Sequence, residues 1–522
     1  MRGLARSLVA LACVAPLVAC GGGEAGGGEL DGPLGYLPED TGLVVVVPTD
    51  IEGDQLQRLD RKIVQPASEG RTLESLLREA AAGSNLSWED DLKPLLGNPL
   101  VIGTQSASGP FAGDGGSITA AIETRDGEKL REVVEKLPGV ERDGEESGAD
   151  IYTETDPGGS ALAIEGDTLV VAQNRATLSL ALEQRESSGG LTSEGLDEAL
   201  ADPSDDALVR ARVTVTTLIA ALDSSETAKL RSVPWFAALR TVGVVASFPD
   251  DEHVTVDLAL NTEEVSEDDL PIAVGEEAPE IVRRDGEIAG ANRDQSRTTV
   301  FLLRAARTVF PDSRFVRAVD DIEQDLGIDF EEEILRQFNG PSVSTVSFDG
   351  RSFAARSEVR DPDELREQLK ALAPRLPELV QGLEGLRSQG LALLLLFAPD
   401  APVTTMALGQ VNVETPASED DLYHVSGLTG DGPSDLYFGL VGDVFVIGSD
   451  EERARAIAEA DTESVEGARG AAVTRFDARE GTSELLDRFG LSAADFPLGE
   501  VVGTLEASVD RVRATLRVEL PG

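Results

Sequence analysis

Two hydrophobic patterns alternate along this chain of 522 residues. Residues 242–260 end as a hairpin of alternating apolar and polar positions with Asp250 at its turn, which predicts strands with one buried face. Apolar side chains recur at helical spacing in residues 125–137, which predicts an amphipathic helix. Short predicted strands joined by turns, with helices between them, indicate an α+β fold built on antiparallel sheet.

The predicted elements occur twice. Residues 86–99 match residues 328–341, and both begin with a capping residue, an aromatic residue and three acids, as is typical of a helix start. Residues 125–137 match residues 360–372 as a second helix. The remaining matches pair Tyr152 with Tyr423, residues 161–172 with 437–448, and residues 242–260 with 502–520. Such self-similarity indicates a duplicated structural unit.

We therefore predict two tandem copies of an antiparallel sheet with helices packed on one face. Copy 1 is expected over residues 36–262 and copy 2 over residues 265–522. Copy 2 also carries an insertion at about residues 374–413, because the corresponding connection in copy 1 is more than thirty residues shorter.

The insertion contains the longest apolar run of the chain, at residues 391–398. That run is far shorter than the roughly 20 residues of a membrane-spanning helix. One interpretation is an extra helix and strand packed on the core. The other is a hydrophobic surface that takes a lipid, a partner or a membrane. Its candidate residues are Leu391, Leu393, Leu394, Leu395, Leu396 and Phe397.

The N-terminus has the layout of a signal peptide. Arg2 and Arg6 precede about a dozen apolar residues, which suits residues 1–19 as a segment removed on export. A glycine-rich stretch at residues 20–35 is predicted to be a flexible tether.

The residues Leu17, Val18, Ala19 and Cys20 resemble the bacterial lipobox. The resemblance implies cleavage between Ala19 and Cys20, and a diacylglycerol with palmitate-type acyl chains on Cys20. The alternative is a plain secretory signal with an accidental cysteine. Two or more acyl chains hold a protein firmly on a bilayer, so we expect an extracytoplasmic protein anchored to the cell membrane.

The composition narrows the choice of partners. Hydrophobic residues make up 41% of the chain, which is enough for packed cores. The formal net charge of −51 repels phosphate backbones, so nucleic acid is not an expected partner. The membrane, reached through the N-terminal lipid, and an unidentified envelope protein or apolar ligand are the expected partners.

The body also resembles a known family. Residues 36–47, the acidic helix that starts at Trp88, and the paired turns at residues 166–167 and 442–443 carry the resemblance. From about Leu34 to the end, the chain is similar to an uncharacterised family of bacterial exported proteins and lipoproteins, known as a domain of unknown function. The resemblance implies an extracytoplasmic two-copy α+β protein and supplies no catalytic residue.

No sequence motif indicates catalysis or a cofactor. His253 and His424 are the only histidines, and two distant histidines without a partner cysteine make a poor zinc site. Neither a phosphate-binding Gly-rich loop nor a nucleophile elbow occurs. We therefore expect no catalytic residues, no metal site and no cofactor.

Three hypotheses for function follow. The first is a non-enzymatic binding or structural module of the cell envelope. The alternative is a carrier of a lipid or other apolar ligand, which would use the insertion or a cleft between the copies. The third and weaker hypothesis is a hydrolase that uses a pair of carboxylates.

Overall fold

The computed structural model describes residues 28–68, 70–82, 86–104, 117–155, 159–187, 189–202, 206–217, 229–379, 407–418, 421–429, 433–479 and 498–520. Twenty strands in these residues form one open antiparallel sheet, and helices pack against it. The predicted α+β class is confirmed. Within the described residues, no helix combines the length and the apolar composition that crossing a bilayer requires.

The first ten strands pair in a fixed order. From the outer end to the middle of the sheet, that order is β4 (Val140–Glu146), β5 (Ala149–Glu154), β6 (Ala161–Glu165), β7 (Thr168–Ala172), β3 (Ile118–Glu123), β2 (Leu100–Thr104), β1 (Leu43–Val47), β8 (Val209–Thr214), β9 (Leu239–Ser247) and β10 (His253–Thr262).

The second ten strands repeat this order. They are β14 (Ala407–Glu414), β15 (Tyr423–Thr429), β16 (Asp435–Val441), β17 (Val444–Gly448), β13 (Phe353–Glu358), β12 (Ser342–Ser347), β11 (Glu287–Asn292), β18 (Ala472–Asp477), β19 (Glu500–Ala507) and β20 (Arg511–Glu519). Each strand has the same neighbours as the strand numbered ten lower, so the two halves share one topology.

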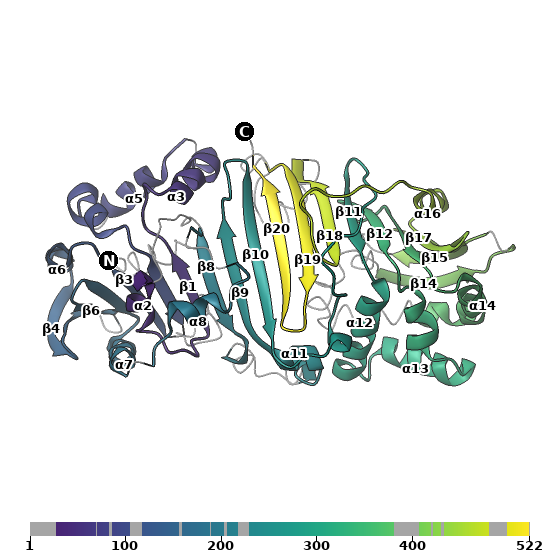
Figure 1. Ribbon diagram of the computed structural model, residues 1–522, viewed down its shortest axis with the longest axis horizontal. Coiled ribbons are helices and arrows are strands. Elements are labelled where there is room, and N and C mark those ends of the chain that lie inside the picture. Colours follow the sequence, from purple (N-terminus) through teal and green to yellow (C-terminus); the bar gives the residue numbers. More distant parts are fainter. Residues whose placement is uncertain are drawn as a thin grey trace.

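The two halves meet at a continuous ladder. β10 and β20 pair from His253 opposite Glu519 to Asn261 opposite Arg511. Figure 1 shows β9, β10, β20 and β19 side by side in the middle of the molecule, with one half of the fold on each flank. The copies are therefore joined as one sheet.

Helices cover both faces of each half, which corrects the expectation of helices on one face. In the first half, Val170 and Ala172 of β7 pack with α7 (Arg175–Glu186), whereas Leu169 and Val171 pack with α6 (Gly127–Lys136). In the second half, α16 (Glu451–Ala458) and α14 (Pro362–Leu372) take the same opposite positions around β17. The physical reason is that these strands are apolar on both sides, as central strands covered on both faces are.

The remaining helical elements lie between the strands. They are α2 (Gly28–Leu34), α3 (Asp54–Leu59), η1 (Asp60–Val64), α4 (Gln65–Ala67), α5 (Leu73–Ala82), η2 (Trp88–Leu92), η3 (Lys93–Leu95), α8 (Ser193–Asp197), α11 (Pro234–Ala238), η4 (Glu267–Asp269), α12 (Gln295–Val309), α13 (Arg314–Leu326), η5 (Phe330–Ile334), η6 (Leu335–Gln337) and η7 (Ala373–Arg375).

The predicted tether is shorter than the sequence suggested. Residues 28–34 form the helix α2, whose Leu30 and Leu34 are fully buried against Val44 and Leu196. The two leucines lie four residues apart and therefore share one face of the helix. Residues 28–34 of the predicted tether therefore belong to the folded body.

Candidate functional site

The structure does not describe the residues of the predicted anchor and apolar surface. Leu17, Val18, Ala19 and Cys20 lie outside the described residues, and so does the run from Leu391 to Phe397. Both assignments stay predictions.

The two histidines lie far apart in the sheet, on β10 and on β15. The Nδ1 atom of His253 is 2.9 Å from an oxygen of Asp250. The Nε2 atom of His424 is 2.9 Å from Asp435, its Nδ1 atom is 3.4 Å from Glu414, and its ring stacks on Tyr437. Burial lowers the pKa of His424, but the hydrogen bonds to the two carboxylates outweigh burial and raise it overall. The structure does not bring the two histidines together.

No candidate metal centre occurs among the described residues, since none of their His, Cys, Asp and Glu side chains form a group of three or more suited to hold an ion. Two of the hollows in the described part of the chain combine a volume near 300 Å³ with several apolar lining residues, and we take them as candidate sites. One lies where the two copies meet, and the other lies in copy 2.

The first hollow is a groove of about 290 Å³ at the junction of the copies. We call it the junction groove, and its lining residues are Val256, Leu258, Ala472, Val473, Thr474, Gly503, Thr504, Leu505, Ala514, Thr515 and Leu516. Its volume is close to the lower end of the range for small-molecule sites, about 300–1,000 Å³.

Strand alternation gives the groove its apolar character. Val256 lies opposite Leu516, and Leu258 lies opposite Ala514, so these four side chains share one face of the β10–β20 ladder. Leu505 of β19 lies opposite Ala514 and extends the same face.

The other face of these strands is charged. Asp257 is buried there and accepts hydrogen bonds from the guanidinium of Arg513 and from the hydroxyl of Thr515. Asp257 and Arg513 therefore join the two copies on one face of these strands, and apolar side chains such as Leu258 and Leu516 line the groove on the other.

Among the described residues, helices cover the two ends of the apolar face, and none packs over its middle. At one end, Leu260 and Val512 pack with Trp235 of α11 and Phe301 of α12. At the other end, Val254 packs with residues of α3 and α5. Between these clusters Leu516 is 42% exposed, which is unusual for a leucine in the middle of a large sheet.

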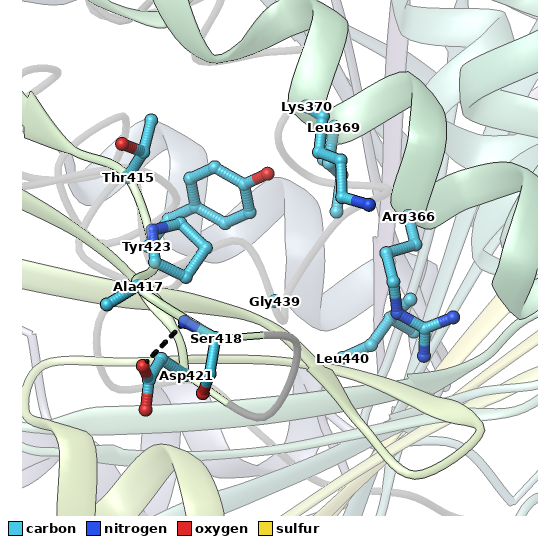
Figure 2. A pocket seen from close by; sticks show the side chains of 11 residues that line it. Arg366, Leu369, Lys370, Thr415, Ala417, Ser418, Asp421, Tyr423, Gly439 and Leu440 are labelled. Atoms are coloured by element: carbon cyan, nitrogen blue, oxygen red, sulfur yellow. Dashed lines mark hydrogen bonds between the residues drawn. The ribbon is translucent and has the colours of Figure 1, made fainter.

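The second hollow, which we call the copy-two pocket, has a volume of about 300 Å³. Its lining residues are Arg366, Leu369, Lys370, Thr415, Pro416, Ala417, Ser418, Asp421, Tyr423, Gly439 and Leu440. Figure 2 shows Arg366 and Lys370 of α14 on one side of the cavity, and Tyr423, Ser418 and Asp421 on the other.

The charged groups of the copy-two pocket have local partners. Arg366 lies 2.6 Å from Asp363, and Lys370 lies 2.8 Å from Glu367. The backbone N–H of Ser418 donates to Asp421. Tyr423 is buried and stacks on Phe438, and this burial is the main reason why the pKa of its hydroxyl is raised.

The sequence suggested a cleft between the copies as one option, but it named no residue of the junction groove and did not indicate the copy-two pocket. The alternation in residues 242–260 and 502–520 was visible, but one sequence does not show that the two hairpins lie edge to edge. The copy-two pocket depends on a loop at residues 415–422, for which no sequence motif stands out.

The molecule is thus a two-copy antiparallel α+β protein whose open middle lies between the copies. Residues 4–257, just under half of the chain, match the family model described as "Protein of unknown function (DUF3352)". This match confirms the resemblance to an uncharacterised family. No curated protein matches the chain.

Solved structures of TP0453 are similar at a low level. Crystal form IV is 9% identical, with a TM-score of 0.26 over 44% of this chain and 80% of that chain. Crystal form III is also 9% identical, with a TM-score of 0.26 over 45% and 81%. Crystal form I is 10% identical, with a TM-score of 0.25 over 45% and 80%. Scores this low carry no argument about fold or function.

Proposed function

We propose that this chain is a non-enzymatic, lipid-anchored binding protein of the cell envelope, and that its ligand is an apolar chain that lies in the junction groove. The single observation that carries the proposal is the open apolar strip between the helices at the two ends of the central strands.

The chemistry of the groove supports an apolar ligand. Its lining is made of aliphatic side chains, glycine and threonine, and none of its residues is ionisable. Transfer of apolar surface out of water contributes roughly 25 cal/mol per Å², so an acyl chain gains free energy by covering Leu258 and Leu516. A charged ligand would lose its hydration there without gaining a partner.

A neutral fluorescent probe tests this proposal. We expect phenylnaphthylamine to bind the full chain carrying Cys20→Ala, and we expect Leu516→Glu to weaken that binding at least tenfold. The reason is that the variant places a carboxylate in the apolar strip. Leu516 is exposed enough for the variant to fold.

The matched control is Leu326→Glu. Leu326 is 37% exposed at the end of α13, outside both hollows, so the variant adds the same charge at a similar exposure elsewhere. Equal loss of binding in the two variants, or no loss in either, would remove the junction groove as the binding site.

The anchor is proposed from the sequence resemblance at Cys20. We expect Cys20→Ala to move the protein from the membrane fraction to the soluble extracytoplasmic fraction, because the acyl chains would be lost. A substituted protein that still sediments with membranes would contradict the lipid anchor without bearing on the groove.

A further inference from the structure

The loop that borders the copy-two pocket is longer than the loop at the same place in copy 1. In copy 1, the strands β4 and β5 are joined by the two residues Ser147 and Gly148. In copy 2, the connection between β14 and β15 spans residues 415–422, and five of its described residues line the pocket, namely residues 415–418 and Asp421. The longer loop is therefore an addition to the shared fold.

The floor of the pocket is apolar and fixed in place. Leu369, Tyr423 and Leu440 are all buried, and they belong to one hydrophobic cluster between α14 and the sheet. The stack of Tyr423 on Phe438 holds its ring at a centroid distance of 5.1 Å. A rigid apolar floor favours a ligand with a flat or aliphatic body.

The rim of the pocket is cationic, in a protein whose formal charge is −51. Arg366 and Lys370 lie one turn apart on α14 and border the cavity, as Figure 2 shows. Both have an acid partner on their own helix, but the side chains of these acids, Asp363 and Glu367, are 96% and 75% exposed. Such exposed ion pairs contribute little to the free energy of folding, so an anionic ligand can replace the acids as the partner of Arg366 and Lys370.

Copy 1 uses the corresponding positions differently. By the match of residues 125–137 with 360–372, Arg366 corresponds to Arg131, and Lys370 corresponds to Glu135. Arg131 donates to the backbone carbonyls of Gly127 and Gly166, so it serves the fold. By contrast, the Nε atom of Arg366 is buried, and no partner for it occurs in the described part of the chain.

We infer that the copy-two pocket binds a small anionic amphiphile, whose carboxylate or phosphate group meets Arg366 and Lys370 while its apolar body lies on Leu369, Tyr423 and Leu440. Asp421 lies on the opposite wall and accepts a hydrogen bond from the backbone N–H of Ser418. Its negative charge repels the anionic group of the ligand from that end of the cavity. This site is separate from the junction groove and does not depend on the function proposed for it.

An anionic fluorophore tests the inference on the full chain carrying Cys20→Ala. We expect anilinonaphthalene sulfonate to bind, and we expect Lys370→Gln or Arg366→Gln to weaken that binding about tenfold or more, because each variant removes a charged hydrogen bond. Lys370→Arg keeps the charge and should keep the affinity within about threefold. Arg455→Gln is the control, since Arg455 also pairs with an acid on its own helix, away from the pocket.

The neutral analogue phenylnaphthylamine separates the two sites. It should bind the Lys370→Gln variant as it binds the parent chain, and only Leu516→Glu should weaken it. The inference would be overturned if Arg455→Gln weakened binding of the sulfonate probe as much as the pocket variants do. It would also be overturned if Lys370→Gln and Arg366→Gln both kept the parent affinity for that probe. Neither outcome depends on binding at the junction groove.

Competition distinguishes an amphiphile from a simple anion. Octyl phosphate and octanoate should displace the sulfonate probe at concentrations at which inorganic phosphate does not, because only the alkylated compounds cover the apolar floor. Equal displacement by inorganic phosphate would show that the floor takes no part and would overturn the amphiphile class.

Discussion

At the scale of single residues, the described charges mostly stabilise the fold. Asp91 is buried and accepts hydrogen bonds from the backbone N–H of Ser87 at 2.9 Å and from Lys136 at 2.6 Å. The hydrogen bond from Lys136 is the largest reason why the pKa of Asp91 falls to about 2. This carboxylate joins η2 to α6, which are two of the elements that the duplication predicted.

Asp91→Asn is therefore expected to lower the free energy of unfolding by about 1–2 kcal/mol at pH 7. The folded-state pKa is depressed, so the stabilisation is present above the unfolded value of about 3.9 and is lost as the pH falls toward 2. Urea unfolding from pH 7 to pH 3 should show the difference from the parent chain shrinking below pH 4.

Glu79→Gln is the control for Asp91, because Glu79 pairs with Arg71 on the exposed surface and should cost little. A difference between Asp91→Asn and the parent chain that is the same at pH 3 and at pH 7 would rule out the charge as its source.

For His424, the expected pH dependence of stability has the opposite sign to that of Asp91. Its pKa is raised because its contacts with Asp435 and Glu414 outweigh burial. Its contribution to stability is therefore full below the unfolded value of about 6.5 and is lost as the pH rises through the folded value. His424→Gln should cost about 1 kcal/mol or less at pH 5.5 and less still at pH 9, as measured by urea unfolding.

Asp435→Asn removes the nearer carboxylate, and in that background the pH dependence of the His424→Gln effect should be much smaller. A larger cost of His424→Gln at pH 9 than at pH 5.5 would contradict the raised pKa.

At the scale of elements, local sequence signals predicted helix starts well. Ser87 and Asp329 accept hydrogen bonds from backbone N–H groups of the helical turns that follow them, as the sequence predicted, and Asp126 and Asp361 do the same for the second pair of helices. A capping side chain bonds within one helical turn, so the few residues around it are enough to predict where the helix starts.

Features that depend on tertiary packing were predicted only in part from the sequence. The continuous apolar runs at residues 161–172 and 437–448 are typical of strands buried on both faces, yet helices were expected on one face only. In the tether, the spacing of Leu30 and Leu34 was hidden by the surrounding glycines. Glycine lowers helix propensity, and only the tertiary contacts of the two leucines offset that cost.

The boundary of the tether can be tested directly. Leu34→Ala should lower the free energy of unfolding by about 2–4 kcal/mol, because it removes a fully buried side chain and leaves a cavity. If Leu34→Ala and the parent chain were equally stable in urea unfolding, the longer tether predicted from the sequence would be correct.

At the scale of the whole molecule, the pairing of β10 with β20 turns two copies into one sheet. The duplication was visible in the sequence, but this pairing was not, because backbone hydrogen bonds between edge strands leave no residue signature. The same pairing creates the junction groove, since neither copy alone brings Leu258 and Leu516 onto one face. The candidate site is therefore a property of the assembled pair of copies.

The most direct measurement is mass spectrometry of the protein isolated under native conditions from its own membrane, and of the compounds extracted from it. We expect a stoichiometric apolar molecule on the parent chain and on Leu326→Glu, and we expect its loss from Leu516→Glu. A parent chain that carries no apolar molecule, or a Leu516→Glu variant that carries as much as the parent chain, would contradict the central claim.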